Sequence, residues 1–564
     1  MLMTKWGEDL NKNCPLSEYP RPQFKRDSYF NLNGMWQCEF CESEEIPSKF
    51  SYDIVVPFSP EAPLSGVNRI LKSTEYLIYN KEFDLPDGFN KGRVFIHFGA
   101  VDQIAKVYIN GQFVGVHHGG YTPFTFEITE QIKEHNVINV VVRDLTEKNE
   151  YSRGKQKTNR GGIWYSAQSG IWQTVWLEST PVDYIPNVLI TPDLDSQTVK
   201  FETENDLTVQ KLIYDGDNLI ADTTDDVVKI DNAKEWSPKN PFLYDVVFKY
   251  KDDEVHSYFG MRKFSVGKDG SGMPRLMLNN KPYFMNGLLD QGYYPDGFLT
   301  PPSNEAMEFD VKSVKNLGFN MLRKHIKIEP MLWYHYCDVN GIIVWQDMIN
   351  GGGNYGLEVN AIPFVGINLD DTNYKIFKRT SLEARKLYYK ELDEMVTALY
   401  NCPCIAMWVP FNEGWGQFDS NYAYTFIKAM DNTRIVDSAS GWHDRGNTDV
   451  ISKHIYFTPI KVHSGVKPWC LTEFGGLSIR VKGHTFNNKM FGYKIFNSKE
   501  ALTKAYKNLF EKTIIPQIKD GLSATVYTQV TDVEDELNGL FTYDRKVQKI
   551  DTDVLKSINE RVKL

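Results

Sequence analysis

Two glutamates stand out in this 564-residue sequence because each follows a short, strongly apolar run. Glu413 comes after Met407-Trp-Val-Pro-Phe-Asn412, and Glu473 comes after Trp469-Cys-Leu-Thr472. Two carboxyl groups held about 5–5.5 Å apart can hydrolyse a glycosidic bond with retention of configuration. One, protonated, releases the leaving oxygen, and the other, ionised, forms a covalent bond to the sugar. The two glutamates are therefore a candidate general acid/base and nucleophile.

The elements that must position these glutamates are eight short apolar runs in the second half of the chain. They alternate with segments of helical periodicity, of which 303–317 and 381–400 are clear examples. This alternation predicts a (β/α)8 barrel over residues 268–564, with reactive side chains at the C-terminal strand ends. Taken alone, the two glutamates could also be loop carboxylates that cap helices. The predicted strands are 283–286, 320–323, 341–345, 405–409, 434–437, 450–453, 469–472 and 524–527.

The first half of the chain predicts two β-sandwich domains, because short β-prone runs alternate there with turn residues. In the first domain, residues 1–180, the pair Asn110-Gly111 lies between two runs and signals a tight hairpin. The second block, residues 181–267, has the size and alternation of a small immunoglobulin-like sandwich. The clearest runs are 94–98, 105–109, 113–116 and 137–142 in the first domain, and 198–203, 207–213 and 244–250 in the second.

Composition and charge exclude several classes of protein. No stretch approaches the roughly 18 consecutive apolar residues of a membrane span. The basic residues are dispersed in a chain of net charge −10, which argues against nucleic acid as a partner. The N-terminal residues lack a signal-peptide pattern, and seven scattered cysteines indicate reduced thiols, so we expect a cytoplasmic protein. The aromatic fraction of 13% suits the stacking of sugar rings on flat side chains.

The motifs around the two glutamates are similar to those of glycoside hydrolase family 2, which includes β-galactosidases, β-glucuronidases and β-mannosidases. Asn412-Glu413 resembles the acid/base motif of that family, and Thr472-Glu473-Phe-Gly resembles its nucleophile motif. The resemblance implies a jelly-roll sugar-binding-like domain, an immunoglobulin-like domain and a catalytic TIM barrel, in that order. Further similar motifs follow the family order along nearly the whole chain, at 32–36, 169–178, 236–244 and 259–262.

The resemblance also implies roles for single residues. Glu413 would be the acid/base and Glu473 the nucleophile, with the charge of Glu473 raising the pKa of Glu413. Asn412 would bind the sugar 2-hydroxyl, Arg323 would keep Glu473 ionised, and Tyr456 would touch Glu473. No metal or other cofactor is implied, because a carboxylate supplies the nucleophile. Residues that resemble the rim of the family's sugar pocket are His325, Trp345, Asp347 and Asp290.

The identity of the sugar is less constrained. Family β-glucuronidases share an Asn-x-Lys motif for the sugar carboxylate; here Asn487-Asn-Lys489 has that pattern, but it lies so soon after Glu473 that we interpret it as a surface loop. The segment 529–539 offers polar groups suited to neutral hydroxyls, which favours a neutral sugar over a uronic acid. The resemblance makes β-galactosidase the leading hypothesis, because it is the commonest activity of the family. β-Glucuronidase, β-mannosidase or another activity of the family, and a non-catalytic carbohydrate-binding protein, are the alternatives. The expected partner is a small or oligosaccharide substrate, and self-association stays open.

Overall fold

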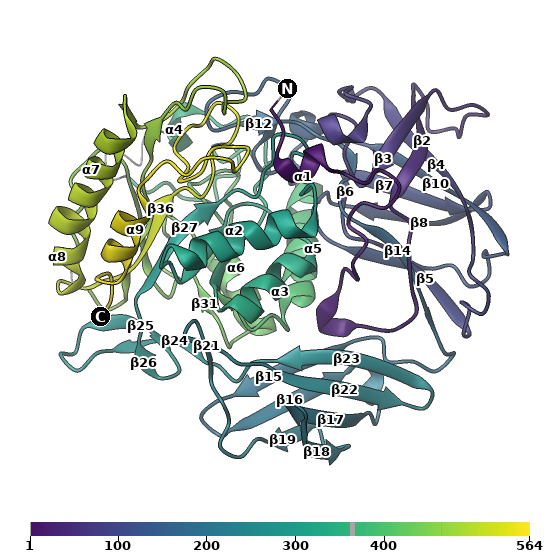
Figure 1. Cartoon of the computed structure of the whole chain (residues 1–564), viewed down its shortest axis with the longest axis horizontal. Helices are drawn as coiled ribbons and strands as arrows, with labels where there is room; N and C mark the ends of the chain where they lie inside the picture. The colour runs from purple at the N-terminus through teal and green to yellow at the C-terminus, as the bar shows by residue number, and fades with distance from the viewer. Residues whose placement is uncertain (1, 361–366, 464) are drawn as a thin grey trace.

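The computed structural model describes residues 2–360, 367–463 and 465–564, which form three domains in the expected order. Two β-sandwiches pack against one parallel β/α barrel, the first beside it and the second below it in Figure 1. Within the described residues, no helix combines the length and the apolarity that crossing a membrane requires. All seven cysteines, each of which is described, are free thiols.

The N-terminal domain is a sandwich of a four-stranded and a six-stranded sheet, ordered β1-β14-β5-β9 and β3-β2-β4-β10-β7-β8. Its core consists of the inward side chains of both sheets, including Trp36, Val107 and Val140. The expected hairpin joins β7 to β8, and its two turn residues have φ of 52° and 78°, as a tight hairpin turn requires. The strands are β1 (Tyr29–Asn31), β2 (Gly34–Cys41), β3 (Tyr52–Val56), β4 (Tyr76–Asp84), β5 (Arg93–Phe98), β7 (Ile104–Ile109), β8 (Gln112–His118), β9 (Phe124–Glu127), β10 (His135–Arg143) and β14 (Val175–Thr180).

The second domain is a smaller sandwich of sheets β15-β16-β19 and β18-β17-β22-β23, closed over a core that includes Phe201 and Phe248. A three-stranded sheet, β24 (Phe264–Lys268), β25 (Pro274–Leu278) and β26 (Lys281–Pro282), connects it to the barrel. The boundary that we expected between residues 267 and 268 falls inside β24. The sandwich strands are β15 (Val188–Asp193), β16 (Thr198–Thr203), β17 (Gln210–Asp215), β18 (Asn218–Thr223), β19 (Val227–Lys229), β22 (Tyr244–Tyr250) and β23 (Asp253–Phe259).

The barrel contains eight parallel strands in the order β31-β30-β29-β28-β27-β36-β33-β32, and each overlaps one of the eight runs identified in the sequence. A hydrogen bond of 2.9 Å from Asp449 N, two residues before β32, to Val436 O in β31 connects the two ends of this strand order. Helices such as α2 (Asn304–Asn316) and α5 (Leu382–Leu399) follow the strands, each capped by a serine as helix starts prefer. The strands are β27 (Met285–Asp290), β28 (Met321–Lys324), β29 (Ile343–Asp347), β30 (Ile405–Val409), β31 (Ile435–Val436), β32 (Ile451–Ile455), β33 (Trp469–Gly475) and β36 (Leu522–Thr528).

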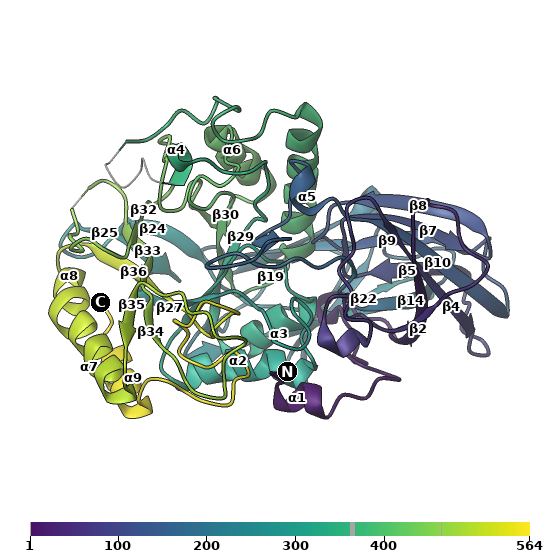
Figure 2. The same ribbon diagram turned by 90° about the horizontal axis from the view of Figure 1, so that it is seen from above.

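One segment of the first sandwich, residues 150–168, reaches across to the barrel. Arg153 N donates to Asn350 O (3.0 Å), just beyond the end of β29. Tyr165, in β12 (Tyr165–Ser166), donates its hydroxyl to Glu536 Oε2 at 2.5 Å. Figures 1 and 2 both show the first sandwich packed directly beside the barrel. The segment therefore forms part of the surroundings of the barrel mouth.

Candidate active site

Glu413 lies in the loop that follows β30, in a backbone conformation that non-glycine residues seldom adopt. Its φ is 51°, in the left-handed region, and Gly414 follows with φ of 72°. Such a conformation costs about 1–2 kcal/mol and persists where neighbouring contacts impose it. Here Glu413 N donates to Ser440 O at 3.0 Å, and Asn412 forms a β-bridge with Ser440. The loop thus holds the carboxyl group of Glu413 at the C-terminal end of the barrel strands.

Glu473 lies within β33, at an irregularity of that strand. The register between β33 and β36 shifts between Leu471 and Phe474, so one extra residue is accommodated there. Bulges of this kind redirect a side chain and are common beside active sites. The carboxylate accepts a hydrogen bond of 2.8 Å from the Tyr456 hydroxyl, and Arg323 Nη1 lies 3.4 Å from Oε1. Two donors, one of them charged, therefore favour the ionised form of Glu473.

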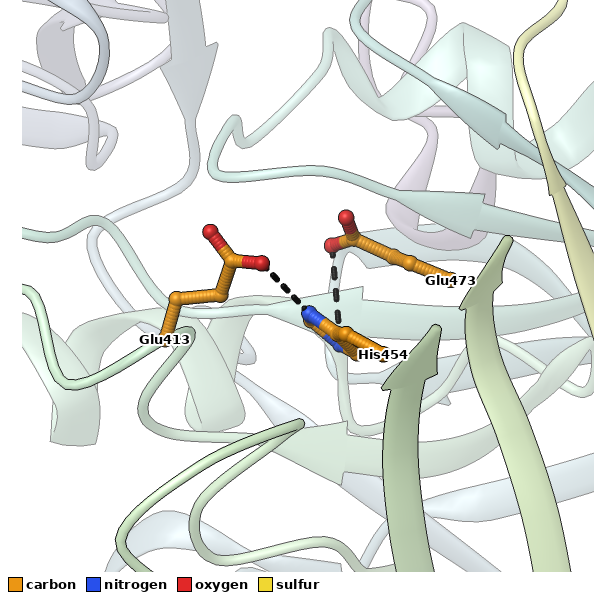
Figure 3. A group of neighbouring side chains, drawn as sticks. All are labelled: Glu413, His454 and Glu473. Carbon is orange, nitrogen blue, oxygen red and sulfur yellow. Dashed lines mark hydrogen bonds and ion pairs between the residues drawn. The ribbon is translucent and has the colours of Figure 1, made fainter. Parts of the chain in front are cut away.

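A histidine from β32 lies between the two glutamates (Figure 3). His454 Nδ1 is 2.8 Å from Glu413 Oε1, and its Nε2 is 3.6 Å from Glu473 Oε1. One polar atom of each side chain lies within 4.8 Å of one polar atom of the others. This separation matches the short spacing of retaining glycosidases and falls below the roughly 6.5–9.5 Å of inverting ones. In the described part of the chain these three residues are also the one group whose spacing could hold a metal ion.

The hydrogen-bond network assigns the tautomer of His454. Arg323 Nη1 lies 3.3 Å from His454 Nε2, and a guanidinium can only donate. Nε2 must then be the acceptor, so the proton is on Nδ1 and is donated to Glu413. Burial lowers the pKa of His454 to about 4, which keeps the ring neutral near pH 7. His454 is therefore a neutral donor to Glu413.

Burial also raises the pKa of both glutamates. It raises the pKa of Glu413 to about 7, and Glu536 adds to this rise while Lys155 and Arg323 oppose it. Burial likewise raises the pKa of Glu473, and the charge of Glu413 adds to that rise. We expected the charge of Glu473 to be what raises the pKa of Glu413; removal of the Glu413 carboxyl from water is the larger cause.

Arg323 organises the floor of the site. Its guanidinium binds Asp347 through two hydrogen bonds of 2.9 and 3.1 Å, and Nη2 donates to Asn412 Oδ1 at 2.7 Å. His325 Nδ1 lies 2.7 Å from Asp347 Oδ2. This hydrogen bond from Arg323 fixes which end of the Asn412 amide is the oxygen. The amide nitrogen at the other end is buried and has no hydrogen-bond partner among the described residues. A free donor beside Glu413 is what binding of a sugar hydroxyl needs.

Two of the expected pocket residues are engaged elsewhere. Trp345 is fully buried in the barrel core, with Nε1 3.3 Å from Met285 Sδ, and does not reach the mouth. Asp290 accepts from Lys324 Nζ at 2.6 Å and from Gly292 N at 3.0 Å. Side-chain hydrogen bonds thus connect Asn412, Arg323, His325, Asp347 and Tyr456 with Glu473, and among the described residues no side-chain hydrogen bond joins Trp345 or Asp290 to this group.

The segment 529–539 does not offer its polar groups to a sugar as we expected. Gln529 and Asn538 bond to each other at 2.7 Å, and Asp532 is bound by Lys549 Nζ. Glu534 accepts from Ser166 N of the first sandwich at 2.9 Å. Most of these groups are bound by one another, by Lys549 or by the first sandwich, which weakens the support for a neutral sugar. Glu534 Oε2 has no hydrogen-bond partner among the described residues and lies 3.1 Å from Arg160 Nη1.

Sequence reasoning missed two residues of the site. His454 lies near the end of β32, two positions before Tyr456, which directly follows the strand; residues two apart along an extended chain point the same way, so a signal was present. Lys155 comes from the first sandwich and is buried, and its charge acts on Glu413, Glu473 and Asp347. No local pattern in the sequence connects Lys155 to the barrel.

Models of one protein family match all three domains. Three family models match in succession: "Glycosyl hydrolases family 2, sugar binding domain" over residues 26–181, "Glycosyl hydrolases family 2" over 184–262, and "Glycosyl hydrolases family 2, TIM barrel domain" over 274–558.

Individual relatives are distant. A β-galactosidase of Thermoanaerobacter pseudethanolicus is 26% identical over 69% of this chain and 51% of its own length. A β-glucuronidase of Streptococcus agalactiae is 24% identical over 70% of this chain and 68% of its own. The chain spans about half the length of the first two curated relatives, both β-galactosidases, which it matches.

Solved structures share the fold over nearly the whole chain. A β-D-glucuronidase of Dictyoglomus thermophilum has a TM-score of 0.76 and 19% identity, covering 96% of this chain and 98% of the other. A β-glucuronidase of an uncultured Clostridium has a TM-score of 0.75 and 18% identity, covering 97% and 99%. Because the barrel model alone matches half of the sequence and the two sandwich models flank it in order, the chain belongs to glycosyl hydrolase family 2.

Proposed function

We propose that this chain is a retaining β-glycosidase that releases terminal non-reducing sugars, with Glu413 as acid/base and Glu473 as nucleophile. The observation that carries the proposal is the pair of buried carboxyl groups at the barrel mouth, held within 4.8 Å of each other and of His454. Glu473 has the donors that favour a carboxylate, whereas Glu413 has a pKa raised to about 7 by burial, as a general acid requires.

In the first step, Glu473 attacks the anomeric carbon while Glu413 gives its proton to the departing glycosidic oxygen. In the second step, the ionised Glu413 takes a proton from water, which attacks the same carbon and releases Glu473. The neutral His454 donates to one oxygen of Glu413 in both steps, which leaves the other oxygen to carry the transferred proton. The amide nitrogen of Asn412, which has no partner among the described residues, would bind the 2-hydroxyl as charge develops.

Two sugars are candidates for the terminal position. β-D-Galactosides come first by sequence, because curated relatives such as those of Thermoanaerobacter and Lactococcus are named β-galactosidases. β-D-Glucuronides come second, because the β-glucuronidase structures match this chain from end to end, including its length.

Stereochemistry tests the proposal directly. NMR of the earliest product released from an aryl β-glycoside should show the β-anomer, since two inversions at one carbon give net retention. Initial appearance of the α-anomer would refute a double displacement by this pair. Absence of hydrolysis across neutral and acidic β-glycosides would favour a non-catalytic carbohydrate-binding role instead.

A further inference from the structure

Lys155 is a buried cation that the proposed mechanism does not use. It lies in the segment of the first sandwich that crosses to the barrel, and its side chain is 6% exposed. The backbone on both sides is fixed, by Tyr165 N donating to Lys155 O at 2.9 Å and by Gly154 N donating to Asn350 O at 3.1 Å. The backbone that carries Lys155 is therefore fixed both within the first sandwich and against the barrel.

Among the described residues, the recorded partners of the Lys155 ammonium group are two aromatic rings. Nζ lies 5.5 Å from the ring centre of Tyr165 and 5.7 Å from that of Trp415. Among the described residues, no carboxylate lies within 4.0 Å of it and no acceptor lies within hydrogen-bonding distance. A buried ammonium without an anionic partner is unfavourable, and aromatic faces compensate it in part. A negatively charged ligand would compensate the charge of the Lys155 ammonium group.

The charge of Lys155 acts on the catalytic groups. It partly offsets the rise that burial gives to the pKa of Glu413, Glu473 and Asp347, and it adds to the lowering of the pKa of His325 by burial. In the described chain, Arg323 is the other cation that acts on both glutamates, and Asp347 and Asn412 already occupy it. Lys155 is thus, among the described residues, a cation whose charge acts on the catalytic pair and which has no anionic partner of its own.

We propose that Lys155 binds a carboxylate of the terminal sugar, so that the preferred substrates are β-linked hexuronic acids. The inference rests on the proposed function and decides between its two candidate sugars. A hydroxyl group of a neutral sugar can accept one hydrogen bond from the ammonium but leaves its charge uncompensated, whereas a carboxylate supplies both. The Asn487-Asn-Lys489 pattern is not needed for this recognition, since Lys489 is solvent-exposed.

The test compares sugars that differ only at C6: nitrophenyl β-D-galacturonide with β-D-galactoside, and β-D-glucuronide with β-D-glucoside. The wild type should have the higher kcat/KM on at least one acidic member of a pair. Lys155→Met should lower kcat/KM on that uronide by about 100-fold, chiefly through KM, and by less than about 5-fold on the neutral partner. Lys155→Arg should recover part of the uronide activity, because it restores the positive charge. Lys157→Met is the matched control, because Lys157 lies over Trp164 (4.5 Å) and is not among the charges that act on the catalytic glutamates.

Several outcomes would overturn the inference. If Lys155→Met lowers kcat/KM equally on the acidic and the neutral sugar of a pair, Lys155 does not bind the sugar carboxylate. A wild type that hydrolyses only neutral glycosides, with retention, would lead to the same conclusion. In both cases the proposed glycosidase would stand. Failure of the wild type on every glycoside would instead count against the proposed function. If Lys155→Met does not fold, calorimetry of galacturonic and glucuronic acid binding to Glu473→Gln, with and without the neutral substitution Lys155→Gln, provides a second measurement. Absence of uronate binding to Glu473→Gln, or equal binding with Lys155→Gln, would also overturn the inference.

Discussion

His454 Nδ1 lies 2.8 Å from Glu413 Oε1, and Arg323 on the opposite side of the ring forces the proton onto that nitrogen. The acid/base is therefore not free in its pocket. One of its oxygens is fixed by a neutral donor, and the other is left for proton transfer. The same imidazole is joined by dashed lines to both Glu413 and Glu473 in Figure 3.

His454→Leu should reduce kcat by about 10–100-fold on substrates with poor leaving groups, because Glu413 loses the donor that orients it. Loss of a donor to the ionised form also raises the pKa of Glu413, so the alkaline limb of the pH profile should move to higher pH. His454→Asn retains an N–H near the position of Nδ1 and should recover much of both effects. An unchanged alkaline limb in His454→Leu would contradict this role.

Glu473→Gln should lower kcat by at least about 10⁴-fold, because an amide cannot form the glycosyl-enzyme. Mass spectrometry after incubation with a 2-deoxy-2-fluoro glycoside should place the trapped sugar on Glu473 in the wild type and find none in the variant. Recovery of the label on another residue would show that Glu473 is not the nucleophile. Asp290→Asn, at a carboxylate engaged by Lys324, serves as a comparison that should still be labelled.

Glu413→Ala should affect poor leaving groups far more than activated aryl glycosides, since general acid catalysis contributes about 10²–10⁴-fold. Azide should rescue the variant by attacking the glycosyl-enzyme without a general base, giving a β-glycosyl azide identified by NMR. Equal losses on good and poor leaving groups, with no azide product, would remove Glu413 from this role.

The pH dependence of kcat/KM should be bell-shaped. Burial raises the pKa of Glu413 to about 7, so the protonated acid is lost and activity falls as pH rises through that value. Burial also raises the pKa of Glu473, so protonation of the nucleophile should stop activity on the acid side above the usual carboxyl range. Because Glu413 and Glu473 interact, the pKa values obtained from the two limbs of the pH profile belong to the pair and not to either residue alone. In Glu413→Gln, assayed with a dinitrophenyl glycoside, the alkaline limb should disappear; its persistence would assign that limb to another group.

Most of the fold could be predicted because its signals are local. The run 405–409 coincides with β30, whereas 469–472 stops short of the end of β33, where the register shift brings in Glu473. The sheet β24–β26 went unnoticed, because its strands are short and one begins with Pro274, which disfavours a strand interior.

The site could be predicted only in part, for a geometric reason. Strands of a parallel barrel are apolar on both faces, so sequence does not separate the Trp345 position in the core from the Arg323 position at the mouth. Strand alternation would have added His454, but Lys155 required knowledge of how the first sandwich docks on the barrel.

The segment 150–168 divides the active site between two stretches of the gene. Both proposed reacting carboxylates are encoded in the barrel. Lys155, which we propose binds the sugar carboxylate, is encoded more than 200 residues upstream in another domain. Recombination that exchanged the first sandwich between relatives could thus alter sugar preference and leave bond cleavage intact. An isolated barrel, in turn, would keep both carboxylates while losing the docking contacts that Tyr165 and Ser166 make with it.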